Sequence, residues 1–120
     1  MEIKGTAKLL RLFVGESDKV GHTPLYEVIV KQARERHLAG ATAWRGILGF
    51  GASARMRTAK LLDLSSDLPM VIEIIDEEKK VDDFIPTLNA LFEKADSGGL
   101  MTIEKVDVIR YVHGSADKSK

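Results

Sequence analysis

The chain has 120 residues, a length typical of one domain, and its 18 basic and 18 acidic side chains balance. The balance excludes the global positive field of a general nucleic-acid-binding protein, so any attraction for anions must come from local clusters. The absence of cysteine excludes disulfides, thiolate catalysis and Cys-based zinc or iron–sulfur sites.

The N-terminal sequence MEIKGTAKLLRLFVGE lacks the basic-then-apolar layout of a signal peptide. No apolar run approaches the roughly 18 residues that are needed to cross a bilayer. We therefore expect a cytoplasmic protein. Residues 1–113 are expected to form one domain, and the polar residues 114–120 are expected to be a frayed tail.

The first half of the chain predicts a strand, a helix and a second strand. Residues 7–16 are rich in Leu, Phe and Val and end in a turn at Gly15, which indicates a strand. Thr23 as N-cap and Pro24 at the first helical position predict a helix that stops near Gly40. Residues 41–48 then read as the second strand.

The second half repeats the order of strand, helix and strand. Residues 68–77, LPMVIEIIDE, predict a third strand, and a second helix opens at Asp76 or Glu77 with an acidic first turn. Pro86 lies inside the helical pattern, so it should kink the helix or split off its first turn. Residues 95–99 end this helix, and residues 100–112 form the last strand.

The predicted order is βαββαβ. With right-handed crossovers, this order gives an α+β fold, the ferredoxin-like sandwich, in which two helices cover one face of a four-stranded antiparallel sheet.

The uncovered face of that sheet is unusually apolar. In the first strand, aliphatic or aromatic side chains occupy both faces, and the third strand repeats this. Charged residues stand among the side chains of the second face, namely Arg11, Arg45 and Glu73. Such a face is most simply buried against another subunit, where the charges could pair across the interface, so we expect an oligomer. The alternative is an open, solvated sheet face.

A basic, glycine-spaced segment follows the second strand. Between Arg45 and Leu62 there is no acidic residue, and the segment supplies four cations, Arg45, Arg55, Arg57 and Lys60. Its glycines, Gly46, Gly49 and Gly51, would let backbone amides approach a phosphate. The spacing matches neither common phosphate-binding loop. Pattern alone therefore favours the alternative, in which the glycines relieve a turn and the arginines are solvated.

Other motifs are weaker. Asp96-Ser97-Gly98-Gly99 could be a second phosphate-facing turn, although a glycine C-cap explains it equally well. None of the three histidines stands at metal-ligand spacing from another, and no nucleophile elbow or catalytic triad can be recognised. No enzyme signature emerges.

Several longer stretches resemble one known family. LLRLFVGESDKVGHTPLYEVIVKQARERHLAGATAWRGILGFG and LSSDLPMVIEIIDEEKKVDDFIPTL are similar to the bacterial and archaeal domain of unknown function 190 family, over residues 8–112. The resemblance implies a PII-like fold, in the superfamily of the nitrogen-regulatory signal proteins and the divalent-cation tolerance proteins, which form trimers.

The resemblance also implies where a ligand would bind. PII proteins hold adenine nucleotides such as ATP or ADP in clefts between subunits, and a loop between the second and third strands reaches partner proteins. Residues 49–66 stand in that loop's place, and residues 46–51, with Phe50, look like the glycine-rich start of the PII loop, which lines the cleft. Residues 96–99 would replace the phosphate-binding turn, with Arg110 as a third contributor. Leu100 and Met101 stand where PII has a lysine, and the loop lacks a modifiable tyrosine.

The resulting expectation is a trimeric PII-like sensing protein. A small anionic ligand, such as a nucleotide, would order residues 49–66 through Arg55, Arg57 or Lys60 and change what they present to a partner. Related proteins also resemble accessory proteins encoded with fluoride exporters, which implies a membrane transporter as the partner. The alternatives are a divalent-cation tolerance protein, an RNA-binding protein that uses Trp44 and Phe50, and a constitutive protein-interaction module.

Overall fold

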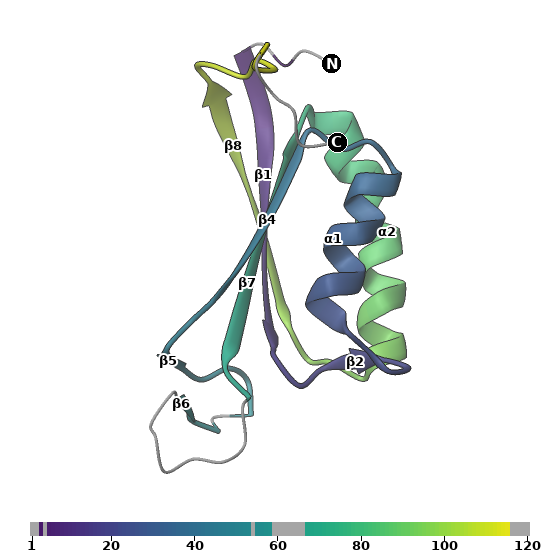
Figure 1. Cartoon of the computed structure of the whole chain (residues 1–120), viewed down its shortest axis with the longest axis vertical. Coiled ribbons are helices and arrows are strands. Elements are labelled where there is room, and N and C mark those ends of the chain that lie inside the picture. Colours follow the sequence, from purple (N-terminus) through teal and green to yellow (C-terminus); the bar gives the residue numbers. More distant parts are fainter. Residues whose placement is uncertain (1–2, 4, 54, 59–66, 116–120) are drawn as a thin grey trace.

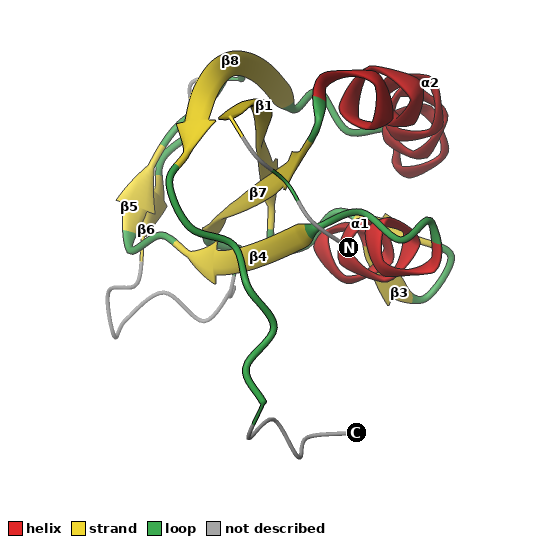
Figure 2. Cartoon of the chain, turned by 90° about the horizontal axis from the view of Figure 1, so that it is seen from above, coloured by secondary structure: helices red, strands yellow, loops and turns green. Residues whose placement is uncertain are grey.

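Four long strands form one antiparallel sheet in the order β4-β7-β1-β8. These strands are β1 (Gly5–Gly15), β4 (Gly40–Arg45), β7 (Pro69–Asp76) and β8 (Leu100–Val108). Two helices, α1 (Leu25–Glu35) and α2 (Glu78–Ala95), cover one face of the sheet, as Figures 1 and 2 show. The predicted ferredoxin-like βαββαβ order is confirmed.

The computed structural model describes residues 3, 5–53, 55–58 and 67–115. Residues 59–66, which include Lys60, and most of the expected tail, residues 116–120, lie outside the described residues. Two small hairpins complete the described elements, the first made of β2 (Lys19–Val20) and β3 (Thr23–Pro24), and the second of β5 (Leu48–Gly49) and β6 (Arg57–Thr58).

The core lies between the sheet and the two helices. Strand side chains alternate between the two faces, so every second residue of β1 and of β7 points toward the helices, and most of these residues are aliphatic. The helices supply apolar residues at three- and four-residue spacing, which places them on the face that meets the sheet. The main buried members are Leu10, Leu12, Leu25, Ile29, Ile72, Ile74, Val81, Phe84 and Leu88.

Several predicted element ends are wrong. The N-cap of α1 is Pro24 rather than Thr23, and the helix begins only at Leu25 because Thr23 and Pro24 both belong to β3 and pair with Val20 and Lys19. The helix stops at Glu35, and His37 then adopts a positive φ of 59°. Strand β4 ends at Arg45, and β8 ends at Val108 rather than residue 112.

Pro86 does not divide α2, which runs unbroken from Glu78 to Ala95. Proline deletes one backbone hydrogen bond of the helix, but Pro86 itself is exposed, so water can reach the backbone there. Buried residues on both sides, Val81 and Phe84 before the proline and Leu88 after it, hold the two parts on the same sheet. Packing of the apolar face therefore outweighs the local defect.

The second face of the sheet carries Phe13 and Trp44, both exposed, beside an ion pair. Arg11 lies opposite Glu73 in the register of β1 and β7, and the Nη2–Oε2 distance is 2.6 Å. Glu104 of β8 lies 3.2 Å from Arg11 on the other side. Arg11 and Glu73 therefore pair within the chain, whereas the sequence suggested that such charges could pair across an interface with another subunit.

Arg45 does not belong to that face. It pairs with Met70 in the register of β4 and β7, and Met70 is buried on the helix side. Its neighbour Trp44 occupies the open face instead. The prediction that Arg45 shares a face with Arg11 and Glu73 is wrong, because the register places Arg45 opposite Met70 and Thr42 opposite Glu73, and side chains alternate along a strand.

The two glycines in the turn between α2 and β8 differ in whether the surrounding structure requires them. Asp96, not a glycine, takes the left-handed position that ends α2, with φ of 51°. A Cβ atom on Gly99 would lie 2.9 Å from the Phe13 carbonyl oxygen and 3.1 Å from the Phe92 ring, whereas one on Gly98 would meet nothing within 4 Å. Only Gly99 is sterically required.

We therefore predict that Gly99→Ala lowers the free energy of unfolding by about 1–3 kcal/mol, because the new methyl group clashes with backbone. Gly98→Ala should change it by less than about 0.5 kcal/mol. Urea unfolding followed by circular dichroism measures both. Equal effects of the two substitutions would contradict the steric explanation.

Candidate functional site

The predicted ligand-binding segments meet at one end of the sheet. Strand β1 ends there, β4 leaves and β7 enters, and the small β5–β6 hairpin extends beyond the sheet (Figure 1). The turn of residues 96–99 joins the same end, because Phe13 near the end of β1 pairs with Leu100. We call this end of the sheet, together with the β5–β6 hairpin and the turn of residues 96–99, the loop base.

Asp67 is the central residue of the loop base. Only 8% of it is exposed, and its Oδ1 accepts a hydrogen bond from the Ser17 backbone nitrogen at 3.0 Å. Nη1 of Arg57 lies 2.5 Å from the same oxygen, and Nη1 of Arg55 lies 3.6 Å from Oδ2. The carboxylate thus joins the segment before β7 to the end of β1.

The surroundings of Asp67 favour its ionised form. Burial by itself would raise the pKa of the carboxyl group, but the hydrogen bonds from Ser17 and the charges of Arg57 and Arg55 outweigh burial. The pKa therefore lies below its ordinary value.

Gly15 makes room for this arrangement. A Cβ atom there would lie 2.8 Å from Cζ of Arg57 and 3.1 Å from Oδ1 of Asp67, so the guanidinium packs directly on the strand backbone. Although Nη1 of Arg57 is at ion-pair distance from Asp67, the geometry does not make a hydrogen bond, and this buried nitrogen has no hydrogen-bond partner among the described residues. Arg57 is therefore held in place by its ion pair with Asp67 and by packing on Gly15.

Glu16 forms a second carboxylate contact. Its Oε2 lies 2.7 Å from Nη2 of Arg45, and its Oε1 accepts a hydrogen bond from the Leu68 backbone nitrogen at 3.3 Å. The Glu16 backbone nitrogen also donates to the Leu68 carbonyl oxygen at 2.8 Å. Three arginines of the predicted anion site are therefore paired with two carboxylates of the same chain.

The glycines of the basic segment differ in their surroundings. Gly46 donates its N–H to the Pro69 carbonyl oxygen at 2.7 Å, and a Cβ atom on it would lie 2.9 Å from Cγ of that proline. Gly49 is less crowded, with Pro69 at 3.4 Å, and Gly51 meets nothing within 4 Å. Crowding by Pro69 thus accounts for a glycine at position 46, whereas among the described residues nothing crowds a Cβ atom on Gly51, and Phe50 is exposed.

The second predicted turn is hydrogen-bonded to the loop base. Ser97 Oγ donates to Asp18 Oδ2 at 2.9 Å, and the same oxygen accepts the Gly15 N–H at 2.8 Å. Gly98 stays open. The structure therefore brings Ser97, Gly98 and Gly99 to the end of the sheet that carries the arginines.

Arg110 is not brought to this site. Arg110 follows β8, whose last residue pairs with Gly5, so it lies at the opposite end of the sheet. Lys60 lies outside the described residues. Sequence reasoning also missed Asp67, Glu16 and Asp18 as contacts of the site, because no spacing rule joins these carboxylates to partners that lie 10 to 79 positions away in the chain.

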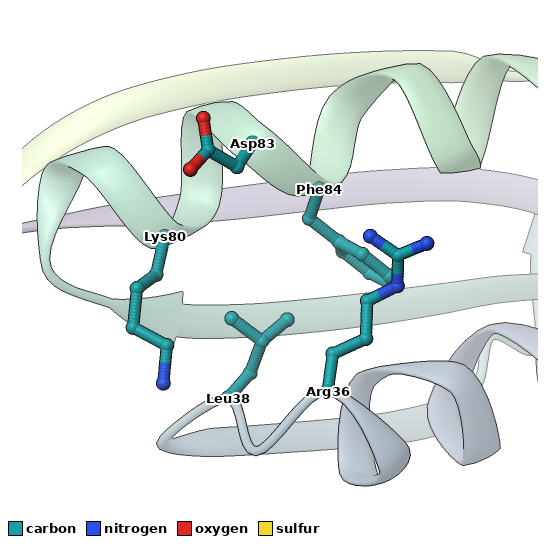
Figure 3. A pocket seen from close by; sticks show the side chains of 5 residues that line it. All are labelled: Arg36, Leu38, Lys80, Asp83 and Phe84. Carbon is teal, nitrogen blue, oxygen red and sulfur yellow. The ribbon is translucent and has the colours of Figure 1, made fainter.

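A separate pocket of about 330 Å³ lies between the end of α1 and the start of α2 (Figure 3). Arg36 stacks over the Phe84 ring at 5.7 Å, and Lys80 donates to the His37 carbonyl oxygen at 2.7 Å. Asp83 pairs with Lys79 at 2.9 Å. Two of the pocket's three charged side chains, Lys80 and Asp83, thus have polar partners within the chain.

Two classes of feature are missing from the part of the chain that the structure describes. It contains no helix that is long and apolar enough to cross a membrane. It also contains no group of three or more His, Cys, Asp or Glu residues placed to hold a metal ion.

The lowered pKa of Asp67 predicts how stability depends on pH. Ionised Asp67 stabilises the fold above its unfolded-state pKa of about 3.9, and this contribution is lost as the pH falls through the lower, folded-state pKa. Between about pH 5 and pH 3, the free energy of unfolding should therefore fall more steeply for the wild type than for Asp67→Asn. Urea unfolding across this range tests it. Parallel pH profiles would show that Asp67 is not preferentially ionised in the fold.

Comparison with known proteins identifies the fold. A nitrogen-regulatory PII-like protein, CPII from Thiomonas intermedia K12, solved with ADP, AMP and bicarbonate, superposes with a TM-score of 0.66 over 88% of this chain and 90% of that chain, at 18% identity. The fold is thus PII-like.

Closer relatives carry no functional name. A UPF0166 protein from Aquifex aeolicus is 42% identical over 85% of this chain and 92% of its own length. A UPF0166 protein from Methanocaldococcus jannaschii is 30% identical over 87% of this chain and 93% of its own length. The family model DUF190, described as "Uncharacterized ACR, COG1993", matches residues 7–108. The chain belongs to this DUF190 (UPF0166) family.

Proposed function

We propose that the protein is a PII-like sensor that binds a small anion, with an adenine nucleotide as the leading candidate, at the loop base. The observation that carries the proposal is the convergence of Arg45, Arg55 and Arg57 with the turn of residues 97–99 at one end of the sheet. CPII, which shares the fold, was solved with ADP, AMP and bicarbonate. Guanidinium groups pair with phosphate oxygens in a planar, bidentate geometry.

The site would be completed by other copies of the chain. Arg45 and Arg55 side chains are 56% and 61% exposed, so the loop base of one chain is open to solvent. Arg110, at the opposite end of the sheet, could reach a ligand only from another copy. Exposed Phe13, Trp44 and Leu100 on the open face supply the apolar surface for association. We propose that the assembly is a trimer.

The same segment offers a surface to a partner protein. Large apolar side chains stand exposed around the β5–β6 hairpin, namely Ile47, Leu48, Phe50 and Met56. They flank the arginines that would hold the ligand, so occupancy of the site can change how they are presented. In this proposal the partner is a protein, such as a membrane transporter reached from the cytoplasm.

We predict that ADP or ATP raises the melting temperature of the wild type, because a ligand at about 100 times its Kd adds about 2.7 kcal/mol of stability. The Arg55→Ala/Arg57→Ala variant should lose most of that ligand-induced increase, whatever its own melting temperature. Arg34→Ala, on the exposed surface of α1, is the matched control. A thermal-shift assay measures all three. No shift with any nucleotide, in a protein that forms trimers, would support a constitutive interaction module instead.

We also predict that the wild type has the mass of a trimer in light scattering after size-exclusion chromatography. Trp44→Glu should lower the mass, because it places an unpaired charge on the apolar open face. Asn89→Glu, exposed on α2, should leave it unchanged. A monomeric wild type would contradict the proposed assembly.

A further inference from the structure

The carboxylates of the loop base stand where an anionic ligand would compete with them. We propose that Glu16 and Asp67 determine ligand charge, so that the site accepts a polyphosphate and discriminates against a monoanion. The inference rests on the proposed function and concerns the same arginines.

Two of the three arginines are well placed to exchange partners. Arg55 lies 3.6 Å from Asp67, a long contact, and both it and Arg45 are more than half exposed. Arg57, whose side chain is only 22% exposed, is in close contact with Asp67 and packs on Gly15. A ligand can therefore recruit Arg45 and Arg55 while Arg57 and Ser17 continue to neutralise Asp67.

The charge of the ligand decides whether this exchange is favourable. A monoanion can replace only one carboxylate, and the displaced carboxylate loses its partner, so little is gained. A polyphosphate presents several charges, and it can contact Arg45 and Arg55 together. Asp18 adds a third carboxylate nearby, which further disfavours weakly charged ligands.

A simpler explanation makes the opposite prediction. If Glu16 and Asp67 only hold the arginines in place, their removal should weaken the binding of every anion. If they compete with the ligand, neutral isosteres should strengthen the binding of a monoanion most, because the freed guanidinium can then pair with it.

The test measures binding of three probes, ADP, inorganic pyrophosphate and bicarbonate, by calorimetry at fixed ionic strength. The proteins are the wild type, Glu16→Gln and Asp67→Asn. The control is Asp83→Asn, which makes the same charge change on an exposed side chain of α2, on the helix side of the sheet. ADP and pyrophosphate together show whether the base or the phosphates are recognised.

We expect the wild type to bind a polyphosphate and to bind bicarbonate much more weakly. Glu16→Gln should strengthen bicarbonate binding by about threefold to fivefold, the effect of one partly exposed ion pair, and should change pyrophosphate binding less. Asp67→Asn should act in the same direction, and Asp83→Asn should have no effect. If Asp67→Asn fails to fold, Glu16→Gln alone decides the test, since glutamine keeps the oxygen that accepts the Leu68 N–H.

The remaining outcomes separate the two proposals. Equal weakening of all probes in the variants, or bicarbonate bound by the wild type as tightly as ADP, would overturn charge selection and leave the anion sensor intact. No binding of any probe to any of the proteins would overturn both.

Discussion

The loop base depends on one buried, ionised carboxylate. Asp67 connects three parts of the chain, because it accepts the Ser17 N–H at the end of β1 and contacts Arg55 and Arg57 from the segment after β4. Burying a charge is costly unless hydrogen bonds and opposite charges surround it. The surrounding groups therefore have to be in place together, which fixes the entry to β7 relative to the exit from β1.

Gly15 shows how closely the sheet and this cluster are coupled. The last residue of a core strand has no side chain, and the Arg57 guanidinium occupies the space that a side chain would fill. The hydrogen bonds of Asp18 to Gly15 and Ser97 extend the same network to the turn before β8. Structural support and the proposed ligand site are thus one set of contacts, so a ligand that draws on the arginines acts directly on the strand ends.

On the open sheet face, the chain itself provides partners for the charged side chains but leaves apolar side chains exposed. Arg11 is neutralised by Glu73 and Glu104 within the chain, so these charges do not require a partner. The exposed aromatic side chains beside them, Phe13 and Trp44, are not compensated in this way. It is their apolar area, rather than the ion pairs, that argues for another copy on this face.

Much of the fold could be predicted from local pattern. The alternation of β1 and β7 and the helical spacing of Val81, Phe84 and Leu88 specify the elements and their buried faces. The errors came where tertiary contacts override local preference. Pro86 is tolerated because packing holds α2 on both sides, and α1 begins one residue later than expected because Thr23 and Pro24 both pair in a hairpin.

The sequence by itself determined the ferredoxin-like order, the family resemblance and the basic, glycine-spaced character of the segment after β4. Only the tertiary structure decided that the arginines of this segment already have carboxylate partners. The physical reason is distance along the chain. Glu16 and Asp67 are far from each other in the sequence, and both are far from Arg45. They come to the same end of the sheet only because β1 and β7 are adjacent antiparallel strands, so that the end of β1 lies beside the start of β7.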